Sequence, residues 1–232
     1  MAAKLNIVAV GASITYGLKS VGGNGYRDDL FSALQKSGNQ VHMVGTQKSG
    51  TMSQPFSEGY PGFTIDKVKA KITENWNKLQ YPPNVIVTLV GTNDQIPGKN
   101  LACGSVDRFG GLLDQYLSLC PDCTIVASTL PPNGNAKENK NIDNYNTGIT
   151  KLVADRQAKG QHILIVNGNK GLSLATDFSQ DKTHPNNQGY GMIGSRFADQ
   201  VQSAIDKGWI AAPQKFKKRD VWGARANLDF GS

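Results

Sequence analysis

The chain has 232 residues, of which 38% are hydrophobic and 19% are charged, and its formal net charge is +7. This length and hydrophobic fraction are sufficient for one sizeable core and exclude an intrinsically disordered chain. The longest apolar stretch, residues 85–90, is far too short to cross a bilayer, so we expect no membrane partner.

The positive charge is concentrated at the C-terminal end of the sequence. The segment from Lys207 onward contains six basic and two acidic residues, so four of the seven excess positive charges lie there. The rest of the chain is only mildly basic, which argues against a nucleic-acid partner. We expect residues 215–219 to form a solvated tail; the alternatives are adhesion to an anionic polymer or a processing site.

Apolar runs typical of strands alternate with amphipathic segments typical of helices. In chain order the pattern predicts a strand at 5–10, a helix at 26–36, a strand at 41–45, a helix at 65–79, a strand at 85–90, a helix at 106–119, a strand at 124–128, a helix at 144–157, a strand at 162–166 and a helix at 188–205. The clearest helix is 65–79, where Ile65, Val68 and Ile72 recur at intervals of three and four.

This alternation predicts the fold class. Unbroken apolar strands are typical of a parallel sheet that helices cover on both faces. With right-handed crossovers, the expected fold is α/β: a three-layer α/β/α sandwich with a five-stranded parallel sheet and a flavodoxin-like topology. We assign residues 1–207 to one domain and residues 208–232 to a basic extension without its own core.

Ser13 is the first candidate for chemistry. In open parallel sheets, ligands bind beyond the carboxyl ends of the strands, and Ser13 follows the first predicted strand. There it can project into a crevice whose backbone N–H groups stabilise an anion. The alternative is that Ser13 caps a helix, a common role for serine.

His184 and Asp181 lie in a polar loop before the last predicted helix. The following Pro185 disfavours helical backbone at His184. Asp181 can reach one imidazole nitrogen, which leaves the other free to take a proton from a nucleophile; alternatively, Asp181 only forms a turn. The other histidines, His42 and His162, fall in predicted strands, where we expect structural roles.

Asn93 and Gly62 are candidates for stabilising an oxyanion. Asn93 follows the third predicted strand, where its amide can donate to a developing negative charge; the alternative is an Asx-turn. Gly62 can offer a backbone N–H where a side chain would obstruct the substrate; the alternative is an ordinary Pro-Gly turn. Together the serine, the histidine with its aspartate and these two donors form the set that acyl transfer needs.

The sequence resembles the SGNH hydrolases, the GDSL-like esterase/lipase superfamily. The resemblance rests on residues 11–17 (GASITYG), Gly62, residues 91–94 (GTND) and residues 181–185 (DKTHP), which occur in the family's order. Residues 58–65 and 107–114 look most like the family-3 carbohydrate esterases, which remove acetyl groups from xylan. One departure is Ala12, where the first block usually has an aspartate that supports the nucleophile turn.

The resemblance implies site residues and an SGNH hydrolase catalytic domain over 1–207. Ser13 would be the nucleophile, His184 the general base and Asp181 its partner. The oxyanion hole would consist of the Ser13 and Gly62 N–H groups and the Asn93 side chain. No metal or organic cofactor would be required. The substrate would be an acetyl ester of xylan or a related carbohydrate, and the enzyme a secreted monomer, although no apolar leader follows Met1.

Three alternatives have different tests. The same scaffold could serve a lysophospholipase, thioesterase or arylesterase, which would prefer other acyl lengths. The loss of the aspartate at Ala12 could leave a carbohydrate-binding relative without turnover. A nucleic-acid or anionic-surface binder would show binding that depends steeply on salt.

The three cysteines allow one disulfide and one free thiol. We expect Cys103 to pair with Cys120 or Cys123, and the sequence does not choose between them. A disulfide would indicate an oxidising compartment. The isolated pair Cys120 and Cys123 has no second C-x-x-C motif, so a zinc site is weakly supported.

Overall fold

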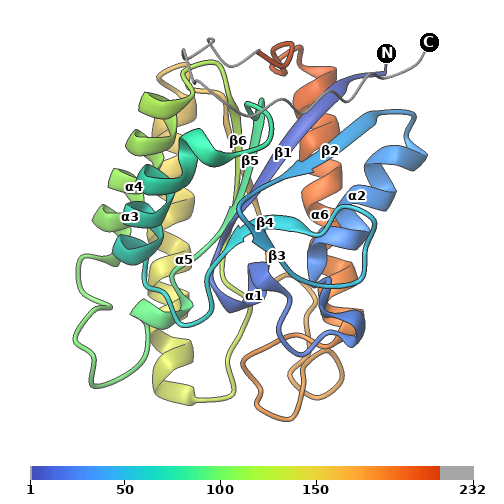
Figure 1. Cartoon of the computed structure of the whole chain (residues 1–232). Coiled ribbons are helices and arrows are strands. Elements are labelled where there is room, and N and C mark those ends of the chain that lie inside the picture. The colour runs from blue at the N-terminus through green and yellow to red at the C-terminus, as the bar shows by residue number, and fades with distance from the viewer. Residues whose placement is uncertain (1, 215–232) are drawn as a thin grey trace.

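A twisted, mostly parallel sheet forms the middle layer of the molecule (Figure 1). The computed structural model describes residues 2–214. The strands are β1 (Lys4–Gly11), β2 (Gln40–Val44), β3 (Gln47–Lys48), β4 (Phe56–Gly59), β5 (Val85–Leu89), β6 (Thr124–Ser128) and β7 (Ile163–Val166). Five of them run parallel in the order β2-β1-β5-β6-β7, which confirms the flavodoxin-like topology.

The expected count of five strands is wrong, because two short strands complete a seven-stranded sheet. β2 pairs with β1 only as far as Val8, and β4 then pairs in parallel with the end of β1, where Gly59 lies opposite Gly11. β3 is antiparallel to β4. These strands have two and four residues and carry polar side chains, so they lack the apolar run by which the longer strands are recognised.

Helices cover both faces of the sheet (Figure 1). On one face lie α2 (Tyr26–Lys36) and α6 (Asn187–Asp206); on the other lie α3 (Ile65–Asn75), α4 (Ser105–Leu119) and α5 (Ala136–Gln157). Short helical turns are α1 (Ser13–Tyr16), η1 (Val21–Gly23), η2 (Trp76–Lys78) and η3 (Thr92–Asp94). α5 begins eight residues before the expected start, because the Asn135 side chain caps its polar first turn by accepting from two backbone N–H groups.

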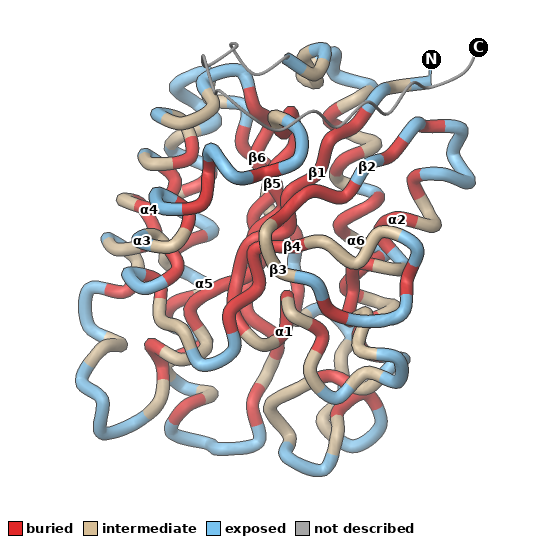
Figure 2. Tube along the Cα trace, in the orientation of Figure 1, coloured by how far each residue is buried: buried red, intermediate tan, exposed pale blue. Residues whose placement is uncertain are grey.

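The core lies between the sheet and its two helical layers (Figure 2). β5 and β6 are buried along their whole length, and β1 is buried except at its first residue. Among residues 2–214, no helix is long and apolar enough to span a bilayer.

The disulfide differs from the expected pairing. Cys120 and Cys123 are joined to each other, and Cys103 is an exposed free thiol. The reason is the 15-residue helix α4, which is about 22 Å long and separates Cys103 at its N-terminal end from Cys120 at its C-terminal end. A disulfide requires Cα atoms within about 7 Å, and those of Cys120 and Cys123 are 5.3 Å apart.

The chain beyond α6 lies against the body as far as it is described. The Trp209 carbonyl accepts a hydrogen bond from Thr124 Oγ1 at 2.9 Å, and the Ala211 carbonyl accepts one from Asn84 Nδ2 at 2.7 Å. The basic run 215–219 falls outside the described residues. The division into 1–207 and 208–232 therefore stays a prediction.

Candidate active site

Ser13 lies at the carboxyl edge of the sheet, just beyond the end of β1. It is the first residue of α1, and Ala12 occupies the N-cap position without a side-chain cap bond. The alternative role of Ser13 as a helix cap is therefore wrong. Its Oγ instead lies 2.8 Å from Nε2 of His184, a residue 171 positions away in the sequence.

The turn that carries Ser13 is held tightly although it has Ala12 in place of an aspartate. At Gly11, a Cβ atom would stand 2.2 Å from the Leu89 carbonyl oxygen, so only glycine fits. Thr15, which is fully buried, places its hydroxyl 3.0 Å from the Tyr26 hydroxyl and 3.4 Å from the Leu89 carbonyl oxygen. Backbone packing and buried hydroxyls thus support this turn.

A buried arginine fixes the loops that follow the turn. Arg27 is fully buried and donates hydrogen bonds to the carbonyl oxygens of Tyr16 at 3.1 Å, Gly23 at 3.2 Å and Ser49 at 2.8 Å. Burial lowers the pKa of Arg27, and nearby tyrosines, Tyr26 first among them, oppose that shift. The Arg27 guanidinium therefore bonds to the last residue of α1 and to two segments that pack beside it, at Gly23 and Ser49.

Asp181 contacts the other side of the His184 imidazole. Its Oδ2 lies 2.9 Å from His184 Nδ1, while Oδ1 accepts hydrogen bonds from the N–H groups of Thr183 and His184 and from the Ser179 hydroxyl. Partial burial opposes ionisation, but these hydrogen bonds outweigh it and hold the pKa of Asp181 well below its ordinary value. The carboxylate is therefore charged and fixed in orientation at neutral pH.

The loop around Asp181 and His184 is a short hairpin-like segment. Phe178 and Pro185 form an isolated antiparallel bridge at its base. Lys182 has a φ of +52°, and its carbonyl oxygen accepts a hydrogen bond from the Gly134 N–H at 2.9 Å. This left-handed residue lies in the turn between Asp181 and His184, where the Asp181 carboxylate contacts one imidazole nitrogen and Ser13 contacts the other.

Gly62 lies in a turn attached to the end of β1. The Tyr60 N–H donates to the Gly11 carbonyl oxygen at 3.0 Å, and the Phe63 N–H donates to the Tyr60 carbonyl oxygen at 3.1 Å. Gly62 has a φ of +80°, which suits the third position of a type II turn. In the described structure, a Cβ there would meet no atom within 4 Å, so the space beside Gly62 is open. The Pro-Gly turn is therefore compatible with a role of the Gly62 N–H as an oxyanion donor.

Asn93 is fixed against the same turn. Its Nδ2 donates a hydrogen bond to the Phe63 carbonyl oxygen at 2.9 Å. Because an amide nitrogen carries two hydrogens, one donor remains for a ligand. The structure thus connects the Gly62 turn both to the end of β1, next to Ser13, and to Asn93.

Two buried carboxylates near the site, Asp94 and Glu58, lie in segments that carry the family resemblance, but the sequence analysis gave them no role. Asp94 accepts hydrogen bonds from the Ile65 N–H and the Arg108 guanidinium, and burial raises its pKa while these bonds oppose the shift. Glu58 accepts from the hydroxyl of Tyr60, whose pKa is raised to about 12 by burial and by that carboxylate. The position of Asp94 beside Asn93, after a buried strand, was an available signal.

The other two histidines, for which we expected structural roles, lie elsewhere. His42 is exposed on β2, and His162 precedes β7 and stacks on Trp209 with ring centroids 4.7 Å apart. Neither contacts Ser13. Among residues 2–214, no group of three or more His, Cys, Asp or Glu side chains lies close enough together to hold a metal ion.

Comparison with known proteins gives one family and several relatives. The family described as GDSL-like Lipase/Acylhydrolase family matches residues 9–192. A multidomain esterase from Ruminococcus flavefaciens is 27% identical, and the match covers 88% of this chain and 29% of that protein. The chain thus spans less than a third of the length of this relative.

Solved structures share the fold. A family 3 carbohydrate esterase from Clostridium thermocellum is 25% identical with a TM-score of 0.76, and the match covers 87% of this chain and 98% of the other. An acetyl xylan esterase from Geobacillus stearothermophilus is 18% identical with a TM-score of 0.63, covering 85% and 94% of the two chains. The second likeness concerns the fold alone.

Proposed function

This chain belongs to the GDSL-like lipase/acylhydrolase family, as an esterase/acylhydrolase of the SGNH type, and on that premise we propose that it is a serine esterase that deacetylates carbohydrates. The observation that carries the proposal is the contact series from Ser13 Oγ through the imidazole of His184 to Asp181, with distances of 2.8 and 2.9 Å. This is the geometry of a nucleophile, a general base and the group that orients the base.

The proposed reaction has two steps. Ser13 Oγ attacks the ester carbonyl carbon, and its proton passes to Nε2 of His184. The imidazolium, stabilised by Asp181, then protonates the leaving alkoxide, so the alcohol departs and an acyl-serine remains. In the second step His184 takes a proton from water, the hydroxide attacks the acyl carbon, and the proton returns to Ser13 as the acid leaves.

The negative oxygen of each tetrahedral intermediate needs hydrogen-bond donors. We assign this role to the N–H groups of Ser13 and Gly62 and to the amide of Asn93. The first N–H groups of a helix lack intrahelical partners, which supports Ser13 at the start of α1. Preorganised donors of this kind stabilise the charge without reorganisation during the reaction.

An acetylated carbohydrate, xylan or a related polymer, is the proposed substrate. The support is the likeness to a family 3 carbohydrate esterase at 25% identity over nearly its whole length. The Cys120–Cys123 disulfide supports a secreted enzyme, because disulfides persist in oxidising compartments. We further propose that it acts as a monomer, without a cofactor, and without a nucleic-acid or membrane partner.

A non-catalytic carbohydrate-binding relative is the second candidate, because Ala12 replaces an aspartate that supports the nucleophile turn in the family. The buried hydroxyl of Thr15 and the close packing at Gly11 favour an active enzyme instead, since they hold the same turn. A lysophospholipase, thioesterase or arylesterase is the third candidate and differs in the length of the acyl group it prefers.

The decisive experiment measures acetate release from acetylated xylo-oligosaccharides. We expect turnover by the wild type, loss of about 10⁴-fold or more in Ser13→Ala, and full activity in Ser195→Ala, an exposed serine on α6. A fluorophosphonate should label Ser13. Carbohydrate binding without labelling or turnover would favour the binding protein, and a maximum at acyl chains of eight or more carbons would overturn the deacetylase.

A further inference from the structure

We propose that Asp94 is a positioning residue for the oxyanion hole: braced by Arg108, it holds the backbone that carries the Gly62 N–H. The inference rests on the proposed function and goes beyond it, because Asp94 touches neither Ser13 nor His184. It also gives a role to Arg108, which lies in the segment 107–114 that no proposed reaction step uses.

Asn93 and Asp94 both hydrogen-bond to the backbone that follows Gly62. Asn93 Nδ2 donates to the Phe63 carbonyl oxygen at 2.9 Å, and Asp94 Oδ2 accepts from the Ile65 N–H at 3.0 Å. These backbone groups flank Thr64, the N-cap of α3, whose own side chain makes no cap bond. Asp94 therefore satisfies a helix N-terminal N–H and fixes where the chain leaves the Gly62 turn.

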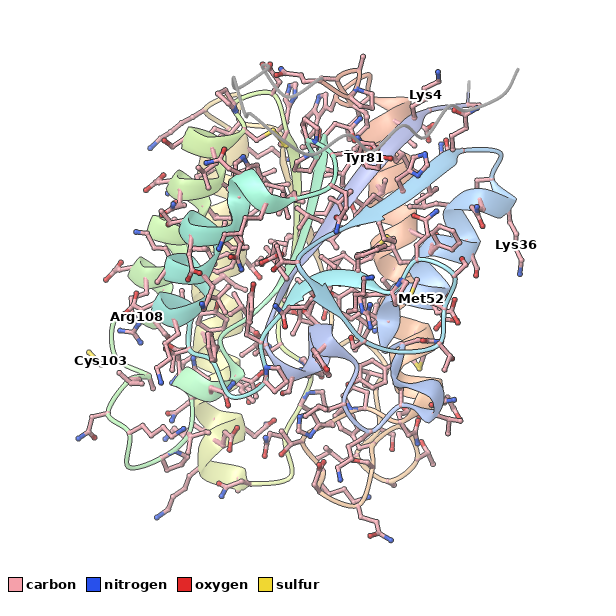
Figure 3. The ribbon with its side chains drawn as sticks, viewed as in Figure 1. Lys4, Lys36, Met52, Tyr81, Cys103 and Arg108 are labelled. Carbon is pink, nitrogen blue, oxygen red and sulfur yellow. A yellow bond between two sulfur atoms is a disulfide. The ribbon has the colours of Figure 1, made fainter. Side chains whose placement is uncertain are left out.

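Arg108 holds the carboxylate from the opposite side. Its Nε and Nη2 lie 3.3 and 3.2 Å from Asp94 Oδ1, and its Nη1 donates to the Cys103 carbonyl oxygen at 3.1 Å. Figure 3 shows Arg108 on α4 close to the loop that carries Cys103. Asp66, on the first turn of α3, lies 3.9 Å from the Arg108 guanidinium. The turn, α3 and α4 thus meet at one ion pair.

The burial of Asp94 makes this ion pair consequential. The Asp94 side chain is 0% exposed and that of Arg108 is 21% exposed. A buried carboxylate is costly unless it is paired and hydrogen-bonded, so removal of either partner should move the attached backbone. A displacement of about 1 Å in a reacting geometry can lower a rate by about 10²-fold.

The test compares Asp94→Asn with Asp114→Asn. Asp114 is an exposed residue on α4, the helix that also carries Arg108, and its Oδ1 lies 2.6 Å from Arg156 Nη1. With an aryl acetate as substrate, we expect Asp94→Asn to lower kcat by about 10- to 100-fold while KM stays within about two-fold. Asp114→Asn should leave both unchanged. Circular dichroism at the assay temperature establishes that each variant is folded.

A double-mutant cycle distinguishes an effect of Asp94 on the position of the Gly62 N–H from an effect on the stability of the fold. If Asp94 acts by holding the Gly62 turn, its effect should shrink to within about three-fold in the Asn93→Ala background, because that variant already removes the hydrogen bond to the Phe63 carbonyl oxygen that holds the same turn. A boronic acid that forms a tetrahedral adduct on Ser13 should bind Asp94→Asn more weakly in proportion to kcat. If Asp94→Asn does not fold, Arg108→Lys and Arg108→Gln replace it, and the lysine should retain more kcat.

Full additivity with Asn93→Ala would overturn the proposal, as would a lowered melting temperature with unchanged kcat. Equal kcat in the two Arg108 variants and the wild type would do so as well. These outcomes leave the proposed esterase intact. A wild-type protein without turnover or labelling at Ser13 would overturn the proposed function, and this inference with it.

Discussion

The two ends of the sheet use polar side chains differently. At the amino edge, Asn84 Nδ2 donates to the carbonyl oxygens of Lys4 and Ala211, and Thr124 donates to that of Trp209. At the carboxyl edge, His184 bonds to both Ser13 and Asp181, and all three side chains remain at least partly exposed. Polar groups at the amino edge satisfy the backbone, whereas those at the carboxyl edge form the proposed catalytic site.

One hollow of the surface lies away from the proposed catalytic site. A hollow of about 430 Å³ lies at the amino edge, where its lining includes Cys123, His162 and Trp209. None of the residues that line it belongs to the Ser13 site. The candidate site is therefore identified by the alignment of Ser13, His184 and Asp181, and not by the volume of a cavity.

If this comparison of the two edges is right, substitutions at the carboxyl edge should lower activity, and substitutions at the amino edge should lower stability.

The largest effect is expected at His184, because its imidazole contacts both Ser13 and the Asp181 carboxylate. His184→Ala should lower kcat by about 10⁴-fold or more, since no other group among residues 2–214 is placed to take the Ser13 proton. Steady-state hydrolysis of an aryl acetate measures this. His162→Ala, at the amino edge, is the matched control and should keep its kcat; equal losses in both variants would erase the distinction between the edges.

Asn93 should give the next largest effect. Asn93→Ala removes one oxyanion donor, so kcat should fall by about 10²- to 10³-fold while the protein still folds. The measurement is kcat with an aryl acetate, together with the unfolding midpoint in urea. Full activity in this variant would remove Asn93 from the proposed oxyanion hole.

The disulfide at the amino edge should affect stability without affecting catalysis. Replacing both Cys120 and Cys123 with serine opens a loop whose ends are three residues apart, which should cost about 2 kcal/mol of unfolding free energy on the chain-entropy account. Urea unfolding measures the loss, and kcat should be unchanged. Cys103→Ser removes the exposed free thiol and should change neither quantity. A drop in kcat without loss of stability would contradict the separation of the edges.

The smallest effect concerns the pH dependence of stability at Asp181. Because the pKa of Asp181 is lowered in the folded protein, its contribution is fully present above the ordinary carboxyl pKa and is lost as the pH falls through the folded value. The wild type should therefore exceed Asp181→Asn in unfolding free energy at pH 7, and the difference should shrink below about pH 4. Asp199→Asn, at an exposed carboxylate on α6, is the control. A constant difference between pH 7 and pH 3 would contradict this linkage.

Local patterns in the sequence were sufficient to predict much of the fold and the candidate residues. The apolar runs that became β1, β2, β5, β6 and β7 predicted the parallel sheet, because burial on both faces requires continuous apolar strands. That sheet in turn predicted that Ser13, Asn93 and His184 would gather at one edge, because the carboxyl ends of parallel strands lie together. The assignment of their chemical roles stays a proposal.

Only the tertiary structure decided which distant groups meet. The length of α4 separated Cys103 from Cys120 and settled the disulfide, and the end of β2 made room for β4 beside Gly11. Asp94, Ile65 and Arg108 meet although up to 43 positions separate them. Periodicity reports only which face of an element is buried, whereas these contacts depend on how whole elements pack in space.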